Sequence, residues 1–107
     1  MSKLPGKPSR GSTTGRPLMV LLDILGQKWT LRILWELSAG CVSFRQLRDM
    51  CDDVSPTLLN NRLKQLRDLR FVALEDCGYR LTGQGEDLVE QFARLDRWAQ
   101  DWSQTIE

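Results

Sequence analysis

The sequence has 107 residues, of which 41% are hydrophobic and 27% are charged, and it contains no histidine. A chain of this length and composition forms one globular domain with one modest core. Without histidine, Ser-His and Cys-His nucleophiles and the commonest metal ligand are excluded, so we expect neither an enzyme nor a metal or other cofactor site.

The net charge is only +1, but the charged residues are unevenly distributed. Residues 1–17 carry four cations and no acid, residues 55–72 carry four cations and one acid, and residues 81–107 are mainly acidic. This split suits a protein with one side facing a polyanion, although chance clustering would also produce it. The sequence contains no membrane-spanning run and no signal-peptide pattern, so we expect a cytoplasmic protein.

The three cysteines, Cys41, Cys51 and Cys77, form an odd set without a CxxC spacing. In a reducing compartment we expect them to be buried or idle thiols. Cys51 falls in an apolar helical stripe, whereas Cys77 falls in a turn and should be the more exposed. A thiol-based redox-responsive regulator that uses one of these residues is kept as an alternative function.

Residues 1–16 are rich in Gly, Pro, Ser and Thr and predict a flexible basic arm. A helix is then predicted from Pro17 to Gly26, with Asp23 as its one polar residue. A helix this apolar must be covered on every side, which calls for a second copy of the chain. The alternative is a central helix wrapped by its own domain.

Two more helices are predicted before residue 52. The first covers residues 27–40 and ends at Gly40, and its inward side chains are expected to be Trp29, Ile33, Leu34, Trp35 and Leu37. The second begins at a capping box formed by Ser43 and Gln46. Its buried stripe is predicted to be Phe44, Leu47 and Cys51.

A fourth helix is predicted after Ser55 as N-cap and Pro56 at the first helical position. At 100° per residue its apolar side contains Leu58, Leu59, Leu63, Leu66 and Leu69. Its other side is free of glutamate and contains Thr57, Asn60, Asn61, Lys64, Gln65, Arg67 and Asp68. Arg62 falls on the apolar side, where its stem could pack and its head could reach an acid.

The apolar period then changes from 3.6 to 2. Alternation of Val72, Leu74, Tyr79 and Leu81 around a Cys77-Gly78 turn predicts a short β-hairpin. A long helix is predicted over residues 84–106, with a heptad-like stripe. The stripe consists of Leu88, Phe92, Leu95, Ala99, Trp102 and Ile106, and it is widened by Val89 and Trp98.

This order of elements predicts a mainly α fold over residues 17–107. It is a winged helix-turn-helix with a short two-stranded β-hairpin wing and a long C-terminal dimerisation helix. The recognition helix, residues 56–69, would place its polar side in the major groove of DNA. Its two adjacent asparagines are poor helix formers, which favours a use for them over simple solvation.

Amide and cationic side chains pair with the base edges of adenine and guanine, and threonine can contact thymine. We therefore assign base reading to Thr57, Asn60, Asn61 and Lys64. Phosphate contact is assigned to Ser55 and Arg67. Further contacts are assigned to Arg45 and Gln46 at the start of the third helix and to Arg80 in the wing.

The sequence resembles the HxlR family of bacterial winged-helix regulators over residues 17–102. The matching positions are Pro17, Leu22-Asp23, Gly26, Lys28-Trp29, Ile33-Leu34, Phe44, Leu47, Ser55, Leu59, Arg62-Leu63, Leu66, Tyr79-Arg80-Leu81-Thr82 and Gly85. The resemblance implies a homodimeric transcription regulator that places two recognition helices in successive major grooves of double-stranded DNA. The implied dimer contacts lie on the first and last helices, at Leu18, Leu21, Leu22, Leu25, Leu88, Phe92, Leu95, Trp98 and Trp102. The sequence does not identify a small-molecule effector.

This chain departs from the family pattern in three places. Arg16 replaces a cysteine with which some members sense electrophiles or oxidants, so that sensing mode does not carry over. The wing is short and its tip is acidic, and Asp52-Asp53 precede the recognition helix. These features leave open a second function, that of a winged-helix protein-interaction module with weak or no DNA binding.

Overall fold

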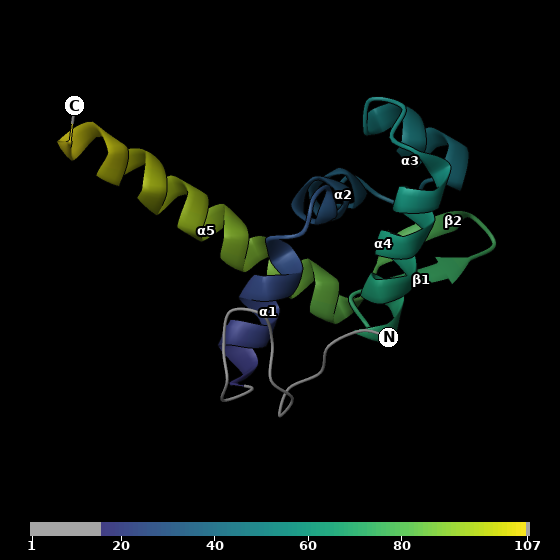
Figure 1. Ribbon diagram of the computed structural model, residues 1–107, viewed down its shortest axis with the longest axis horizontal. Helices are drawn as coiled ribbons and strands as arrows, with labels where there is room; N and C mark the ends of the chain where they lie inside the picture. Colours follow the sequence, from purple (N-terminus) through teal and green to yellow (C-terminus); the bar gives the residue numbers. More distant parts are fainter. Residues whose placement is uncertain (1–15, 107) are drawn as a thin grey trace.

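The computed structural model describes residues 16–106, so the predicted arm lies outside the described residues except for Arg16. The helices are α1 (Pro17–Leu25), α2 (Thr30–Leu37), α3 (Phe44–Met50), α4 (Pro56–Asp68) and α5 (Gly83–Thr105). The strands β1 (Val72–Glu75) and β2 (Gly78–Leu81) form an antiparallel hairpin between α4 and α5. This architecture confirms the predicted winged helix-turn-helix (Figure 1).

Local chemistry explains where the helices begin. Proline occupies the first turn of α1 and of α4, where a missing N–H leaves no helical bond unmade. The predicted capping box starts α3, because the Ser43 hydroxyl accepts from the Gln46 N–H while the Gln46 side chain accepts from the Ser43 N–H. At α5, the Thr82 hydroxyl accepts from the Gly85 N–H and donates to the Arg70 carbonyl.

The core is formed by the end of α1, by α2, α3, α4 and the hairpin, and by the first turns of α5. Trp29, Phe44, Leu58 and Leu69 of the predicted stripes are only partly buried. Eight other residues of these stripes on α2, α3 and α4 are buried in the core. They are Ile33, Leu34, Leu37, Leu47, Cys51, Leu59, Leu63 and Leu66, joined by Val72, Leu81 and Val89 from the wing and α5. Cys51 is thus a core thiol, as predicted, and burial raises its pKa above the ordinary value.

The hairpin makes one further backbone connection, to the segment between α2 and α3. The Val42 N–H donates to the Tyr79 carbonyl over 3.0 Å, and the Tyr79 N–H donates to the Val42 carbonyl over 2.7 Å. The two backbones approach so closely that a Cβ at Gly78 would collide with the Val42 carbonyl. Glycine is therefore required at position 78, and the wing is attached directly to the start of the helix-turn-helix.

Several details differ from the sequence predictions. Trp29 adopts a left-handed conformation at φ 75°, so α2 begins only at Thr30. Trp35 is 56% exposed and does not point inward, because Ile33, Leu34 and Leu37 already fill the buried side of this two-turn helix. The Arg62 guanidinium donates to the Lys28 carbonyl over 2.9 Å rather than reaching an acid.

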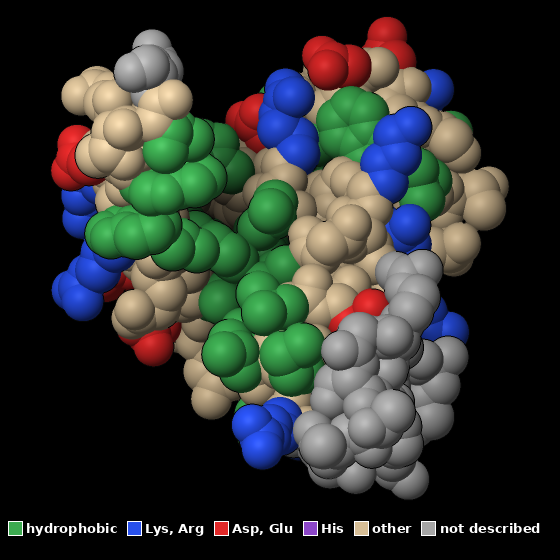
Figure 2. Space-filling view, turned by 60° about the vertical axis from the view of Figure 1, so that its left-hand side comes forward, with side chains coloured by type: hydrophobic (Ala, Val, Ile, Leu, Met, Phe, Trp, Pro, Cys, Tyr) green, Lys and Arg blue, Asp and Glu red, His purple; other side chains and the backbone are tan. Residues whose placement is uncertain are grey.

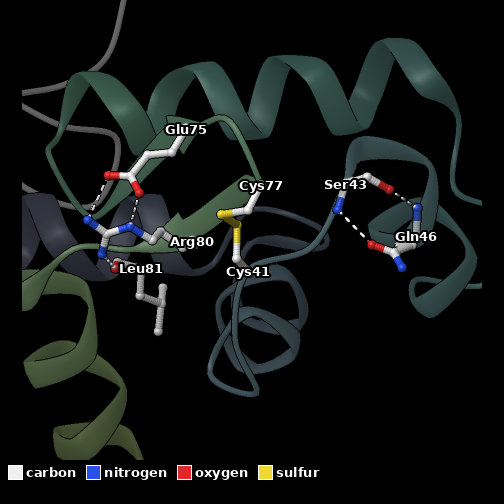
Figure 3. The surroundings of a disulfide bond; sticks show 7 residues. All are labelled: Cys41, Ser43, Gln46, Glu75, Cys77, Arg80 and Leu81. Atoms are coloured by element: carbon white, nitrogen blue, oxygen red, sulfur yellow. Dashed lines mark hydrogen bonds and ion pairs between the residues drawn. A yellow bond between two sulfur atoms is a disulfide. The ribbon is translucent and has the colours of Figure 1, made fainter.

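Two further corrections concern cysteines. The hairpin turn is Asp76-Cys77, one residue earlier than predicted, because Glu75 pairs with Gly78. Cys41 and Cys77 are not idle thiols, since they form a disulfide across a sequence separation of 36 residues (Figure 3).

Candidate nucleic-acid interface

Helix α4 has two chemically distinct sides. Leu59, Leu63 and Leu66 are at most 1% exposed and pack into the core. The five side chains predicted to read bases or bind phosphate along the helix are all exposed, namely Thr57, Asn60, Asn61, Lys64 and Arg67. The helix therefore presents a continuous surface of hydroxyl, amide and cationic groups, which we call the α4 polar face.

The N-terminus of α4 adds hydrogen-bond donors to this face. The Ser55 hydroxyl accepts from the Leu58 N–H over 3.3 Å, as expected of an N-cap, and Ser55 is exposed. Its hydroxyl hydrogen remains able to donate outward. The first N–H groups of a helix and the positive end of its dipole together favour a bound anion such as a phosphate.

The first turn of α3, which opens the helix-turn-helix, carries two of the residues predicted to contact DNA. Arg45 is exposed and Gln46 is exposed. The Gln46 carbonyl oxygen is used in the capping box, where it accepts from the Ser43 N–H over 2.9 Å. Its amide NH₂ group is a separate donor, so capping does not prevent Gln46 from donating to a phosphate.

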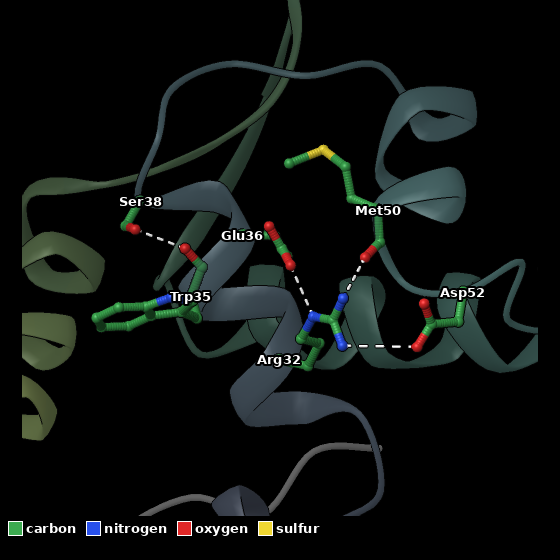
Figure 4. A network of polar contacts seen from close by, with 6 residues as sticks. All are labelled: Arg32, Trp35, Glu36, Ser38, Met50 and Asp52. Carbon is green, nitrogen blue, oxygen red and sulfur yellow. Dashed lines mark hydrogen bonds and ion pairs between the residues drawn. The ribbon is translucent and has the colours of Figure 1, made fainter. Parts of the chain in front are cut away.

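The acidic turn before α4 is held by a cation from α2. Asp52 and Asp53 both adopt positive φ values, 57° and 56°, which aspartate tolerates better than most residues. The Arg32 guanidinium lies 3.6 Å from the Asp52 carboxylate, donates to the Met50 carbonyl over 2.6 Å and pairs with Glu36 (Figure 4). Arg32 thus partly compensates the charge of Asp52 and fixes the end of α3 to α2.

The predicted wing contact, Arg80, is engaged within the wing itself. Its guanidinium makes two hydrogen bonds to the Glu75 carboxylate, of 2.6 and 2.7 Å, and a third to the Leu81 carbonyl over 3.1 Å (Figure 3). This pairing holds the pKa of the Glu75 carboxyl below its usual value. Arg80 therefore has no unpaired donor face comparable to that of Lys64.

The cysteine pair is the element that sequence reasoning missed. Cys41 and Cys77 have Cα atoms 6.1 Å apart, within the usual range for a disulfide. The chain has an odd number of cysteines, and Cys41 and Cys77 are 36 residues apart, so the sequence offered no direct indication that these two would pair. The usable signal was topological, because the segment before α3 lies beside the wing in this fold, where Val42 pairs with Tyr79.

A second surface lies on α1 and on the C-terminal half of α5, and we call it the hydrophobic face. Its exposed side chains are Leu18 and Leu22 of α1, Leu95, Trp98 and Trp102 of α5, and Ile106 at the C-cap of α5, each between 48 and 68% exposed. Figure 1 shows the C-terminal part of α5 projecting from the body, and Figure 2 shows hydrophobic side chains gathered on that side. The exposure of Leu18 and Leu22 excludes the alternative of an α1 wrapped by its own domain.

The predicted dimer residues divide between this face and the interior. Leu18, Leu22, Leu95, Trp98 and Trp102 belong to the hydrophobic face. Leu21, Leu88 and Phe92 are half-buried and pack against the core. Leu25 is only 4% exposed, so it is a core residue with almost no surface to offer a partner.

Neither a metal cluster nor a membrane-spanning helix is found among residues 16–106. In that range no group of three or more His, Cys, Asp or Glu side chains is arranged to hold a metal ion. Within the same residues, none of the helices combines the length and apolar character needed to cross a membrane.

Known proteins resemble this chain in both sequence and structure. The HTH-type transcriptional regulator MJ0925 of Methanocaldococcus jannaschii is 28% identical over 90 residues, which are 80% of this chain and 85% of that protein. YvaP of Bacillus subtilis, also an HTH-type transcriptional regulator, is 28% identical over 89 residues, covering 76% of this chain and 82% of the relative. Both relatives are named as uncharacterized HTH-type transcriptional regulators.

The structural similarity points the same way. Quinone-bound YodB of B. subtilis superposes with a TM-score of 0.74 at 26% identity, covering 78% of this chain and 96% of YodB. A possible HxlR family transcriptional factor of Thermoplasma volcanium gives a TM-score of 0.67 at 26% identity, covering 78% and 82% of the two chains. The family model for the HxlR-like helix-turn-helix matches residues 24–107. The chain therefore belongs to the HxlR-like helix-turn-helix family of transcriptional regulators.

Proposed function

We propose that this protein is a sequence-specific regulator that binds double-stranded DNA with α4 in the major groove. The observation that carries the proposal is the division of α4 between a buried leucine side and the exposed α4 polar face. A recognition helix needs this division, because one side must anchor it in the domain while the other meets base edges. The regulators among the relatives add support.

Base reading is assigned to the N-terminal and central part of the α4 polar face. Asn60 and Asn61 carry amides that can pair with adenine through two hydrogen bonds. Lys64 can donate to guanine, and Thr57 can donate a hydrogen bond or touch a thymine methyl group. All four side chains are exposed and none of them is a carboxylate, so they can approach a polyanion without repulsion.

Phosphate contact is assigned to residues on both sides of that region. Ser55 and the first N–H groups of α4 form one donor group, and Arg67 one turn beyond Lys64 forms another. Arg45 and Gln46, at the start of α3, would meet the backbone nearby. Arg80 would contribute only after leaving Glu75, which makes it the weakest of the predicted contacts.

We further propose that two copies of the chain associate through the hydrophobic face. The six exposed apolar side chains on α1 and α5 are more than a small monomer normally leaves in contact with water. Trp98 and Trp102 lie stacked with ring centroids 6.1 Å apart, which gives the face a flat aromatic centre. A second copy is the simplest occupant, since a twofold axis pairs the same face with itself and provides two recognition helices.

One observation favours the alternative, a protein-interaction module. The wing carries Glu75 and Asp76 at its tip, and its one cation is already neutralised. A wing of this kind contributes only weakly to phosphate binding. The α4 polar face remains unexplained by that alternative, so DNA binding is the better-supported function.

A salt titration with random-sequence duplex separates the two functions. A protein that makes about six to ten phosphate contacts loses roughly 10³–10⁵ in affinity between about 50 and 200 mM salt. The matched pair is Lys64→Ala on α4 and Arg97→Ala, which removes an exposed cation on α5. We expect Lys64→Ala to weaken binding and Arg97→Ala to leave it unchanged. Absence of binding even at low salt would reject the DNA-binding function.

A further inference from the structure

We propose that the Cys41–Cys77 disulfide is a reversible thiol–disulfide exchange site for dithiol reductants, and that its state sets how firmly the wing is held to the helix-turn-helix. The bond joins Cys41, two residues before the N-cap of α3, to Cys77 in the hairpin turn (Figure 3). It is thus a covalent link between the two parts of the fold that approach DNA. The exchange chemistry does not depend on the proposed function, but its consequence for DNA binding rests on it.

The two cysteine residues differ in their exposure to solvent. Cys77 is exposed in the hairpin turn, and Cys41 is half-buried between α2 and the wing. Exchange begins when an external thiolate attacks one sulfur of the disulfide, so access selects the sulfur that is attacked. We infer that the attack occurs at Sγ of Cys77 and that Cys41 is the leaving group.

The steps balance as a two-electron exchange. The reductant's first thiolate forms a bond to the Cys77 sulfur, the Cys41–Cys77 bond breaks, and Cys41 departs as a thiolate that takes up a proton. The reductant's second thiol then attacks its own sulfur in the mixed disulfide, which releases Cys77 as a thiolate that is protonated in turn. The protein disulfide has become two thiols, and the dithiol has become a disulfide.

The backbone around the bond explains why a dithiol is the appropriate partner. Val42, adjacent to Cys41, pairs with Tyr79 through two hydrogen bonds that do not involve the sulfur atoms. Because this pairing keeps Cys41 beside Cys77, the Cys41 thiol is placed to attack the mixed disulfide and expel the reductant. A monothiol bound to Cys77 would be expelled in this way. A dithiol instead forms an internal disulfide with its second sulfur and leaves Cys77 as a free thiol.

The same pairing makes the exchange reversible and limits its structural effect. With the bond open, Val42 and Tyr79 still attach β2 to the segment before α3, and Ser43 and Gln46 still cap α3. The residues released are those of the hairpin turn, Asp76 and Cys77, together with the adjoining end of β1. We therefore expect a looser wing tip in an otherwise unchanged domain.

The exchange is tested on the full chain in buffers that contain set ratios of reduced and oxidised dithiothreitol, followed by alkylation and mass measurement. Cys41 and Cys77 should gain label together in one transition, while the helical circular dichroism stays constant and the buried Cys51 stays unlabelled. Oxidised dithiothreitol should restore the bond. 2-Mercaptoethanol at the same thiol concentration should open less of it. Reduction that requires denaturant, or thiols that do not re-pair, would overturn the proposal.

The effect on the wing is tested with Cys41→Ser/Cys77→Ser as a permanently open control. Amide hydrogen exchange at residues 75–78 should become faster on reduction and should match that of the control, and unchanged exchange would reject the wing effect. Duplex affinity should fall by roughly threefold to tenfold on reduction, the size expected when one or two weak contacts are lost. The control should not respond to reductant. If neither redox form binds duplex, the proposed function fails, and the labelling result alone decides the exchange site.

Discussion

Helices α4 and α5 are both amphipathic, but they differ in where their apolar side chains find partners. The leucines of α4 are at most 1% exposed at positions 59, 63 and 66, because α2, α3 and the hairpin surround them. The stripe of α5 is buried at Val89 but is 50–68% exposed at Leu95, Trp98, Trp102 and Ile106.

This difference assigns opposite uses to the two helices. The apolar side chains of α4 are buried within one chain. Its polar side is therefore available for binding, and the residues on that side indicate the kind of ligand. In α5 the apolar side chains beyond Phe92 remain exposed, so that side indicates a surface for a partner chain. The amphipathic pattern of the sequence does not distinguish a helix buried in its own domain from one that contacts a partner, whereas the exposed fractions of the apolar side chains do.

The largest expected effect is on the buried side of α4. Leu63→Ala should lower the free energy of unfolding by about 2–5 kcal/mol, because it leaves a cavity at a side chain that is 1% exposed. Urea unfolding measures the loss. A change of well under 1 kcal/mol would show that α4 is not anchored as described.

A charged substitution on the exposed part of α5 should prevent dimer formation and not unfold the domain. Trp98→Glu or Trp102→Glu places a carboxylate in the centre of the proposed subunit contact, and we expect monomers where the unmodified chain forms dimers. Gln104→Glu is the matched control, since it adds the same charge to the same helix outside the stripe. Sedimentation velocity distinguishes the species, and an unchanged sedimentation coefficient for both tryptophan variants would reject the hydrophobic face as the interface.

The polar side of α4 should show its effect only in DNA binding. Asn60→Ala should cost about 1–3 kcal/mol on the preferred duplex and relax discrimination at one base position. Gln91→Ala removes an exposed amide from α5 and should leave binding unchanged. Fluorescence anisotropy on preferred and random duplexes measures both. An equal loss on every duplex would show that Asn60 does not read bases.

The smallest effect is expected from the wing. Glu75→Gln removes the carboxylate that engages Arg80, so the released guanidinium should steepen the salt dependence of duplex binding by about one unit of slope. The pairing lowers the pKa of Glu75, so the ion pair persists to a lower pH than that at which an unpaired glutamate would be protonated. Asp87→Asn is the control for the lost charge, and an unchanged slope for Glu75→Gln would show that Arg80 stays away from DNA.

Local patterns predicted the elements because the causes of those elements are local. The Ser43–Gln46 capping box, the Ser55 N-cap and the leucine side of α4 each depend on residues within about two turns of one another. The α4 polar face followed directly from the buried side. The exposed placement of Trp35 was also predictable, since it lies about 200° around the helix from the buried Ile33.

What the sequence did not reveal depends on contacts between distant segments. The Cys41–Cys77 bond requires the loop before α3 to lie beside the wing. Arg62 reaches the Lys28 carbonyl across 34 positions. The left-handed turn at Asp52 is supported by Arg32 from another helix. The Glu75–Arg80 pair is an intermediate case, because the hairpin register makes these residues diagonal neighbours once Glu75 is known to face Gly78.

Selection from a pool of random duplexes shows whether the α4 polar face lies against base edges. We expect the unmodified chain to enrich two half-sites related by twofold symmetry and separated by about 10 base pairs or a multiple of that spacing. Selection with Asn60→Ala should lose the preference at one position in each half-site. If the unmodified chain enriches no sequence, or if Asn60→Ala enriches the same sequence with the same preferences, the α4 polar face does not read bases.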